Sequence, residues 1–232
     1  MIDPESLAQN VKKVQQLIAD ACARAGRQPD DVTLLPVSKT FGSDAIREMV
    51  KLGFKRFGEN RLQEVAQKAP ELADCGIEWV VIGHVQTNKA KEVAKYASEL
   101  QSLDRIELAR ALDKRLAPLN RTLKVLVQVK TSPEETKSGL EPNDLIPFLQ
   151  TISKLPTLKV EGLMTMAVLS DDENAVRNCF KLLRQCRDEA AAAAIEGVSL
   201  DRLSMGMSGD MAIAIEEGST EVRVGSAIFG KR

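Results

Sequence analysis

Short apolar segments alternate with amphipathic segments along nearly the whole chain. Runs rich in Val, Leu and Ile are followed by stretches in which apolar residues recur at helical spacing. Because each strand-like run leads into a helix-like stretch, the pattern predicts parallel strands joined by helices that lie outside the sheet. The strand-like runs are at 32–38, 55–58, 77–82, 99–103, 123–130, 158–166, 201–206 and 220–225.

Eight such units favour closure into a single (β/α)8 TIM barrel of the α/β class. An open doubly wound sheet is the structural alternative, but its usual G-x-G-x-x-G signature is missing, as is G-x-x-x-x-G-K. No linker or change of composition divides residues 1–232, so we expect one domain. The predicted helices are at 43–53, 61–73, 86–96, 105–116, 142–154, 173–195 and 208–217.

An extra helix is predicted before the first strand, over residues 6–26. Its apolar residues fall on one stripe, and Gly26 suits the residue after its C-terminal end. Ser43 is expected to cap the helix that follows the first strand. The stripe consists of Leu7, Val11, Val14, Ile18 and Ala21.

The composition excludes several classes of partner. The 232 residues include 32 Lys and Arg against 33 Asp and Glu, and only 3% are aromatic, which disfavours nucleic-acid binding. No apolar run is long enough to span a membrane, and the N-terminus lacks the features of a secretory signal. Four cysteines without a C-x-x-C pair, together with one histidine, predict no metal site and a reduced, cytoplasmic protein.

Polar and small residues stand where the predicted strands end, which is the functional face of this fold. Lys39 follows the first strand, and in a partly desolvated position its amine would have a lowered pKa and could condense with a carbonyl. Taken alone, a lysine after a strand more often marks the return of the chain to solvent. The remaining strand ends decide between these interpretations.

Two neighbouring loops, "SMGMSGDM" and "RVGSAIFG", follow the seventh and eighth strands. Ser208 is expected to cap the next helix, and Gly225 and Ser226 offer amides and a hydroxyl. For either loop alone, capping and tight packing are a sufficient explanation. Two such loops opposite a lysine instead predict a phosphate site, and hence a phosphorylated ligand that carries a carbonyl.

Other lysines receive simpler interpretations. Lys137, in the polar segment "TSPEETKSGL", is expected to lie in a surface loop, although a secondary ligand contact stays open. Lys89, Lys91 and Lys95 are expected to form a solvated helix face.

Seven motifs in order, from residue 36 to residue 230, carry a resemblance to a known family. The chain resembles the pyridoxal phosphate homeostasis proteins, the YggS/PROSC family, whose fold is similar to the N-terminal barrel of alanine racemase. The motifs are "PVSKT", "FGEN", "IGHVQTNK", "TSPEETKSG", "GLMTM", "LSMGMSGDM" and "STEVRVGSAIFG".

The resemblance implies a protein that binds pyridoxal 5′-phosphate (PLP) in vitamin B6 homeostasis, with Lys39 as the Schiff-base lysine. It further implies that Asn60 and the backbone around His84 surround the ring, and that Arg223 approaches the pyridine nitrogen. PLP-dependent apo-enzymes are the partners it suggests, and a monomer is the form we expect. The cofactor-binding residues predicted in this way are Lys39, Asn60, His84, Met164, Ser204, Gly206, Met207, Ser208, Arg223, Gly225 and Ser226.

A carrier without turnover and a racemase-like enzyme are the two functions that stay open. Racemisation by two bases needs a second proton donor, which in racemase-type barrels is a tyrosine, and the only tyrosine here, Tyr96, lies on a predicted helix. A guanidinium beside the pyridine nitrogen favours its unprotonated form, which is a weak electron sink. The sequence therefore favours the carrier, with no catalytic residue.

Overall fold

The computed structural model describes residues 3–134 and 138–230, and within them eight parallel strands form one sheet. Their order is β1-β8-β7-β6-β5-β4-β3-β2, so the first two strands stand at the two ends of the sheet. The strands are β1 (Thr33–Pro36), β2 (Arg56–Glu59), β3 (Glu78–Val81), β4 (Glu99–Leu103), β5 (Leu123–Gln128), β6 (Leu158–Met164), β7 (Val198–Ser204) and β8 (Glu221–Val224).

The two ends of the sheet meet and close it into a barrel. Val37 forms an isolated bridge with Gly58, and the amide of Ser38 donates to the carbonyl oxygen of Gly58 at 3.0 Å. A methyl group on Gly58 would lie 3.3 Å from Val37, so a residue without a side chain suits this close approach. The predicted barrel is confirmed, and the open sheet is excluded by this closure.

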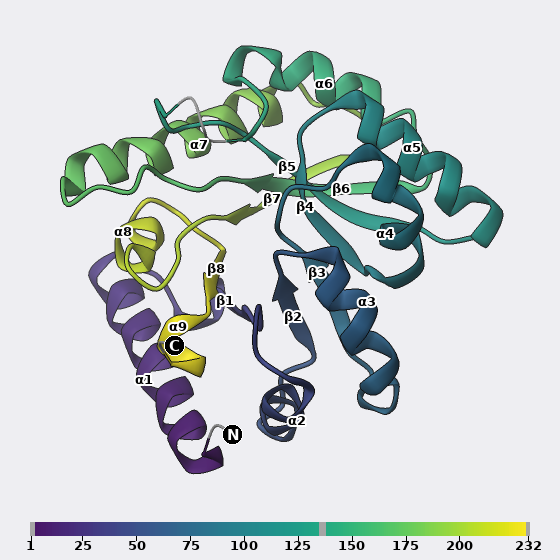
Figure 1. Ribbon diagram of the computed structural model, residues 1–232. Helices are drawn as coiled ribbons and strands as arrows, with labels where there is room; N and C mark the ends of the chain where they lie inside the picture. Colours follow the sequence, from purple (N-terminus) through teal and green to yellow (C-terminus); the bar gives the residue numbers. More distant parts are fainter. Residues whose placement is uncertain (1–2, 135–137, 231–232) are drawn as a thin grey trace.

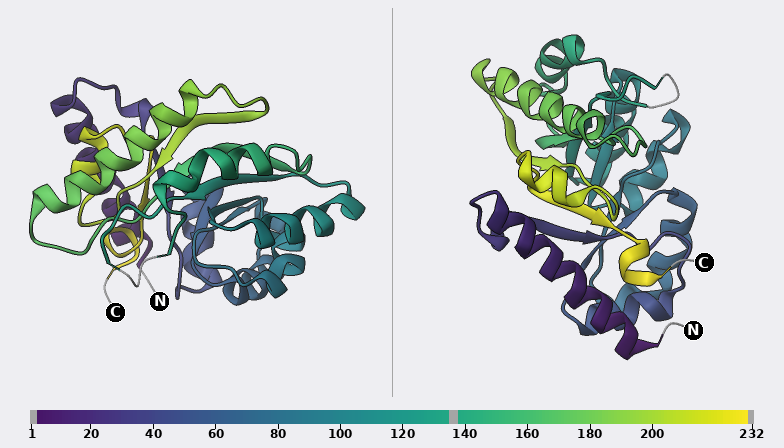
Figure 2. Two further views of the ribbon diagram at one scale, coloured as in Figure 1. Left: turned by 90° about the horizontal axis from the view of Figure 1, so that it is seen from above. Right: turned by 90° about the vertical axis from the view of Figure 1, so that its left-hand side faces the viewer.

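Helices surround the barrel, as the sequence predicted (Figure 1). The leading helix packs against the last two helices, so the first and the last helix lie side by side (Figure 2). The helices are α1 (Pro4–Arg24), α2 (Ser43–Lys51), α3 (Leu62–Glu71), α4 (Ala90–Tyr96), α5 (Ile106–Leu116), α6 (Leu145–Ile152), α7 (Glu173–Ala192), α8 (Met211–Glu216) and α9 (Ser226–Phe229).

Helix boundaries show where side-chain capping was misjudged. Gly42, not Ser43, is the residue before α2, and the Ser43 hydroxyl donates instead to Glu71 on α3. Likewise Asp210, not Ser208, precedes α8, and its carboxylate accepts the amide of Met207 at 2.6 Å.

Gly26 has φ +66 and ends α1 as predicted. Helix α9 was not predicted, because four residues are too few to show a helical period.

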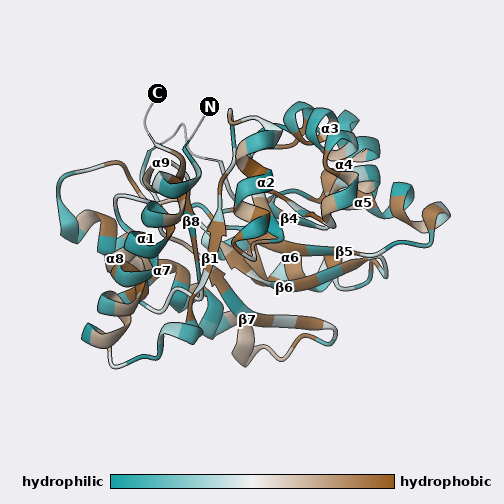
Figure 3. Cartoon of the chain, turned by 90° about the horizontal axis from the view of Figure 1, so that it is seen from below, coloured by the Kyte–Doolittle hydropathy of each residue, from teal (hydrophilic) through white to brown (hydrophobic). Residues whose placement is uncertain are grey.

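The apolar core lies between the strands and the helices. Hydrophobic colour follows β5 and β6 and the faces of the helices turned toward the sheet (Figure 3). All four cysteines are free, and Cys179 and Cys186 are buried in this layer, in agreement with a packing role. Within the described residues no helix is long and apolar enough to cross a membrane, and no group of three metal-binding side chains occurs.

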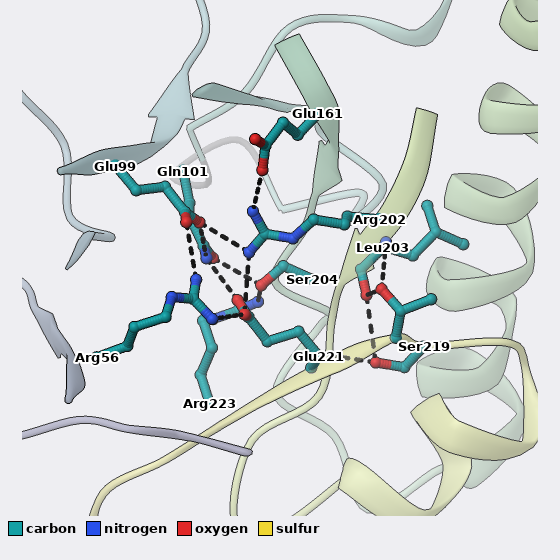
Figure 4. A network of polar contacts seen from close by, with 11 residues as sticks. Arg56, Glu99, Gln101, Glu161, Arg202, Leu203, Ser204, Ser219, Glu221 and Arg223 are labelled. Carbon is teal, nitrogen blue, oxygen red and sulfur yellow. Dashed lines mark hydrogen bonds and ion pairs between the residues drawn. The ribbon is translucent and has the colours of Figure 1, made fainter. Parts of the chain in front are cut away.

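The interior of the barrel contains a buried ionic network, which the sequence analysis did not foresee. Glu99 and Glu221, almost completely buried, each contact the guanidinium groups of both Arg56 and Arg202 at 2.7–3.0 Å (Figure 4). Arg202 also donates to Glu161 at 2.8 Å. We call these five residues the interior ion-pair network. A small apolar cluster occupies another part of the interior and consists of Leu35, Val37, Val80 and Ile82.

The network lowers the pKa of one of its carboxylates, Glu99. Burial by itself would raise the pKa of Glu99, but the hydrogen bond and charge of Arg202, together with Arg56 and Gln101, lower it below the usual 4.5. Because this folded-state pKa is depressed, the stabilisation from Glu99 is present above about pH 4.5 and is lost as the pH falls through the lower value.

We therefore predict that Arg202→Met destabilises the protein by about 3–5 kcal/mol at neutral pH, since it removes a cation from two buried carboxylates. Urea unfolding measured by circular dichroism gives this difference. The loss should shrink as the pH falls from about 4.5 through the lowered pKa of Glu99. The control is Arg187→Met, which removes a pair with the exposed Asp188 and should change stability by less than about 0.5 kcal/mol. Equal effects of both variants would contradict the role of the network.

Candidate functional site

A cavity of about 510 Å³ opens at the carboxyl ends of the strands. It brings together residues from the ends of β1, β2, β3, β6, β7 and β8, the face on which this fold carries its sites. Seven of the predicted residues line it: Lys39, Asn60, Met207, Ser208, Arg223, Gly225 and Ser226.

Lys39 follows β1 and lines this cavity and a neighbouring one of about 360 Å³. Its side chain is exposed, whereas Ser38 beside it is fully buried. The expectation of a partly desolvated amine is therefore wrong. Its predicted position at the mouth of the barrel is confirmed.

Arg223 is the buried cation of the site. It lies on β8, is only 3% exposed, and donates to the Ser204 hydroxyl at 2.8 Å and to the Thr165 carbonyl oxygen at 2.9 Å. Burial lowers the pKa of its guanidinium to about 10, against the opposing charges of Glu221 and Asp210. Arg223 therefore stays protonated at neutral pH and offers the cavity hydrogen-bond donors and no acceptor.

A directed chain of hydrogen bonds links Arg223 to the interior ion-pair network. Ser204 receives a hydrogen from Arg223 and donates its own to Gln101 Oε1 at 2.6 Å. The Gln101 amide nitrogen then donates to Glu99 at 2.7 Å and also to Glu221 (Figure 4). Because both carboxylates can only accept, the direction of every bond back to Arg223 is fixed.

Two hydroxyl groups also line the cavity. Ser208 lies in the loop after β7 and Ser226 begins α9 after β8, and their Oγ atoms are 3.4 Å apart. Two hydroxyls and the adjoining glycine backbone, at Gly209 and Gly225, provide several hydrogen-bonding groups for an anion.

Four predicted residues do not line the cavity. Ser204 is fully buried beneath Arg223, and its hydroxyl is already used, which corrects its place in the phosphate loop. Gly206 has φ +100, and a methyl group there would lie 2.6 Å from Ala214, so it serves packing.

Met164 is fully buried within the sheet, and Met166 takes the place at the cavity. His84 is exposed, while its neighbour Gly83 lines the cavity.

Apart from the backbone beside His84, where Gly83 lies, sequence reasoning did not name the rest of the lining. Val37, Ile82 and Met166 provide apolar surface. Gly83 had a usable signal, because a glycine directly after a strand often marks a close approach of backbone, and a methyl group there would lie 2.0 Å from the Asn60 carbonyl oxygen. Lys137 lies outside the described residues.

The chain matches the alanine racemase N-terminal domain family over residues 2–232. Curated relatives include pyridoxal phosphate homeostasis proteins from Aquifex aeolicus, 42% identical with 97% of each chain covered, and from Escherichia coli, 40% identical with 97% of each covered.

Solved structures agree with these relatives. A protein from Bifidobacterium adolescentis superposes with a TM-score of 0.91 at 36% identity, covering 99% of this chain and 98% of the other. A structure of PipY from Synechococcus elongatus with PLP bound has a TM-score of 0.82 at 35% identity, covering 92% and 100%. Alanine racemase from Clostridium difficile, 15% identical with a TM-score of 0.78, shares the fold over 98% of this chain and 57% of its own. The chain belongs to the pyridoxal phosphate homeostasis protein family, within the alanine racemase N-terminal domain fold.

Proposed function

We propose that this protein binds PLP in the cavity as a Schiff base with Lys39 and holds it for intracellular vitamin B6 homeostasis, without catalytic turnover. The observation that carries the proposal is the convergence of three chemistries on one cavity. They are the amine of Lys39, the buried guanidinium of Arg223 and the hydroxyl pair of Ser208 and Ser226.

Each of these groups fits one part of the cofactor. An exposed primary amine can condense with the aldehyde and release water, and the hydroxyl pair can donate to the phosphate. The apolar side chains of Val37, Ile82 and Met166 suit the faces of a pyridine ring. When bound, PLP supplies an electrophilic carbonyl on a ring that withdraws electrons most strongly when its nitrogen is protonated.

Arg223 supports a carrier more than an enzyme. The hydrogen bonds through Ser204 and Gln101 end at carboxylates, so the guanidinium keeps its proton and can only donate to a ring nitrogen. A nitrogen that accepts from Arg223 is unprotonated, which weakens the stabilisation of a carbanion at the substrate.

The position of Tyr96 points the same way. It ends α4, and Lys95 Nζ lies 4.8 Å from the centre of its ring, so it belongs to the outer helical layer. None of the described residues that line the cavity is a tyrosine. A racemase-like activity is therefore the less favoured alternative.

Release to other proteins is part of the proposal. Lys39, Asn60, Met207 and Ser226 are exposed at the cavity, so a ligand held there would be open to solvent on one side. We infer that PLP-dependent apo-enzymes in the cytoplasm receive the cofactor, and that the protein acts as a monomer.

We predict that borohydride reduction of the protein with PLP places the pyridoxyl group on Lys39, as located by peptide mapping. Lys39→Ala should abolish the imine absorbance and leave the thermal midpoint nearly unchanged, because the side chain is exposed. Lys89→Ala, at a partly exposed lysine that pairs with Glu92, is the control. An adduct on Lys89 or Lys137 in place of Lys39 would refute the assignment.

The hydroxyl pair should recognise the phosphate alone. We predict that Ser208→Ala combined with Ser226→Ala weakens PLP binding about 10-fold or more, since hydrogen bonds to charged groups are worth about 1.5–3 kcal/mol each. Pyridoxal, which lacks the phosphate, should bind these variants as it binds the wild type. Ser204→Ala is the contrast, because its hydroxyl contacts Arg223 and any effect should be equal for both ligands. Equal losses for both ligands in the double variant would show that the phosphate does not bind at Ser208 and Ser226.

We predict no appreciable exchange of the α-proton when the PLP-loaded protein is incubated with L-alanine in deuterated water. Arg223 disfavours protonation of the ring nitrogen, and the described cavity wall holds no tyrosine as a second base. Mass spectrometry of the recovered alanine is the measurement, with an alanine racemase as positive control. Incorporation at rates like those of that enzyme would overturn the carrier proposal.

A further inference from the structure

Two charged residues of α3 form hydrogen bonds with the backbone on both sides of Lys39. Glu64 and Lys68 are four residues apart on this helix and form an ion pair at 3.0 Å. Lys68 is 7% exposed and Glu64 is half-buried, so the pair belongs to the contact between α3 and the strand ends. Neither residue lines the cavity.

Lys68 holds the residue before Lys39. Its ammonium group donates to the Ser38 carbonyl oxygen at 3.0 Å, to Glu59 Oε1 at 2.6 Å and to Glu64 Oε2 at 3.0 Å. An ammonium has three donors, and these partners use all three. The hydroxyl of Ser38 also donates to Glu59 at 2.6 Å, so both the main chain and the side chain of Ser38 are fixed.

Glu64 holds the residue after Lys39. Its carboxylate accepts the amide of Thr40 at 2.6 Å. Thr40 has φ 72, a left-handed conformation that is unusual and strained for a β-branched residue. Burial raises the pKa of Glu64, but the Thr40 amide and Lys68 together lower it, so a charged acceptor holds this conformation at neutral pH.

We propose that Glu64 and Lys68 are positioning residues for Lys39, and that they clamp its neighbours so that the amine is presented to the carbonyl of the ligand. This inference rests on the proposed function. The exposed Lys39 side chain has little packing to orient it, so its direction depends on the backbone at residues 38 and 40. In the step concerned, the amine nitrogen bonds to the aldehyde carbon and the carbonyl oxygen leaves as water, and such a step depends on the approach geometry.

A purely structural role for the pair makes a different prediction. If Glu64 and Lys68 only attached α3 to the barrel, their loss would weaken the fold and every mode of ligand binding together. A clamp on residues 38 and 40 instead affects formation of the covalent bond and leaves the hydroxyl pair of Ser208 and Ser226 unchanged.

The test compares Glu64→Leu with Glu64→Gln. The rate at which the imine band appears after mixing with PLP reports the covalent step, and the affinity for pyridoxine 5′-phosphate, an alcohol that forms no imine, reports the remaining contacts. We expect Glu64→Leu to slow imine formation about 10-fold or more, and Glu64→Gln, which keeps an acceptor for the Thr40 amide, about 3-fold or more. Affinity for pyridoxine 5′-phosphate should change by less than about 2-fold in both.

Glu92→Leu is the matched control. It removes a carboxylate of α4, the helix after α3, that is paired with Lys89 three residues before it, and this variant should behave as the wild type. An unchanged rate in the Glu64 variants, or equal losses in rate and in pyridoxine 5′-phosphate affinity, overturns the positioning role. Glu64→Gln decides alone if Glu64→Leu does not fold. Absence of the imine band from the wild type overturns the proposed function as well, so the two failures are distinguishable.

Discussion

Glu99 and Glu221 depend on the guanidinium groups of Arg56 and Arg202, and the barrel depends on this arrangement. A carboxylate in a closed barrel is costly unless it is paired on several sides, so the strands that carry these residues must keep their mutual positions. The four residues come from β2, β4, β7 and β8, which connects early and late parts of the chain. Many barrels of this kind are filled by branched apolar side chains, whereas here ionic contacts share that role with a small apolar cluster.

The same interior charges determine what the cavity can offer a ligand. Arg223 lies above the network and reaches its carboxylates only through Ser204 and Gln101. The three arginines of the interior are balanced by Glu99, Glu161 and Glu221, so Arg223 can stay charged without a carboxylate in direct contact. The side of the cavity at Arg223 therefore offers hydrogen-bond donors and no acceptor. This is the reason for preferring a cofactor carrier to an enzyme.

Much of the fold could be predicted because the alternation of strands and helices is a local pattern, and the strands 99–103 and 123–128 agree closely with it. The site was harder. Residues at a strand end differ in depth and in the face they point to, so Ser204 and Met164 were placed at the cavity when they lie beneath it. A signal for the ionic interior did exist, since polar residues two apart within a strand point to one face, as in Glu99 and Gln101 or in Glu221 and Arg223. The clamp of α3 on Ser38 and Thr40 left no such signal, because it joins segments through side-chain to backbone bonds.

The seam between β1 and β2 is held by the bridge of Val37 to Gly58 and the adjoining bond of Ser38. Few backbone hydrogen bonds cross it, so its closure also depends on the contacts that Glu59, Glu64 and Lys68 make with residues 38 and 40. Lys39 lies directly after one side of this seam and Asn60 directly after the other. A molecule that contacts both therefore binds the closed barrel in preference to the open one, and the amide of Ser38 becomes a reporter of occupancy through its rate of hydrogen exchange.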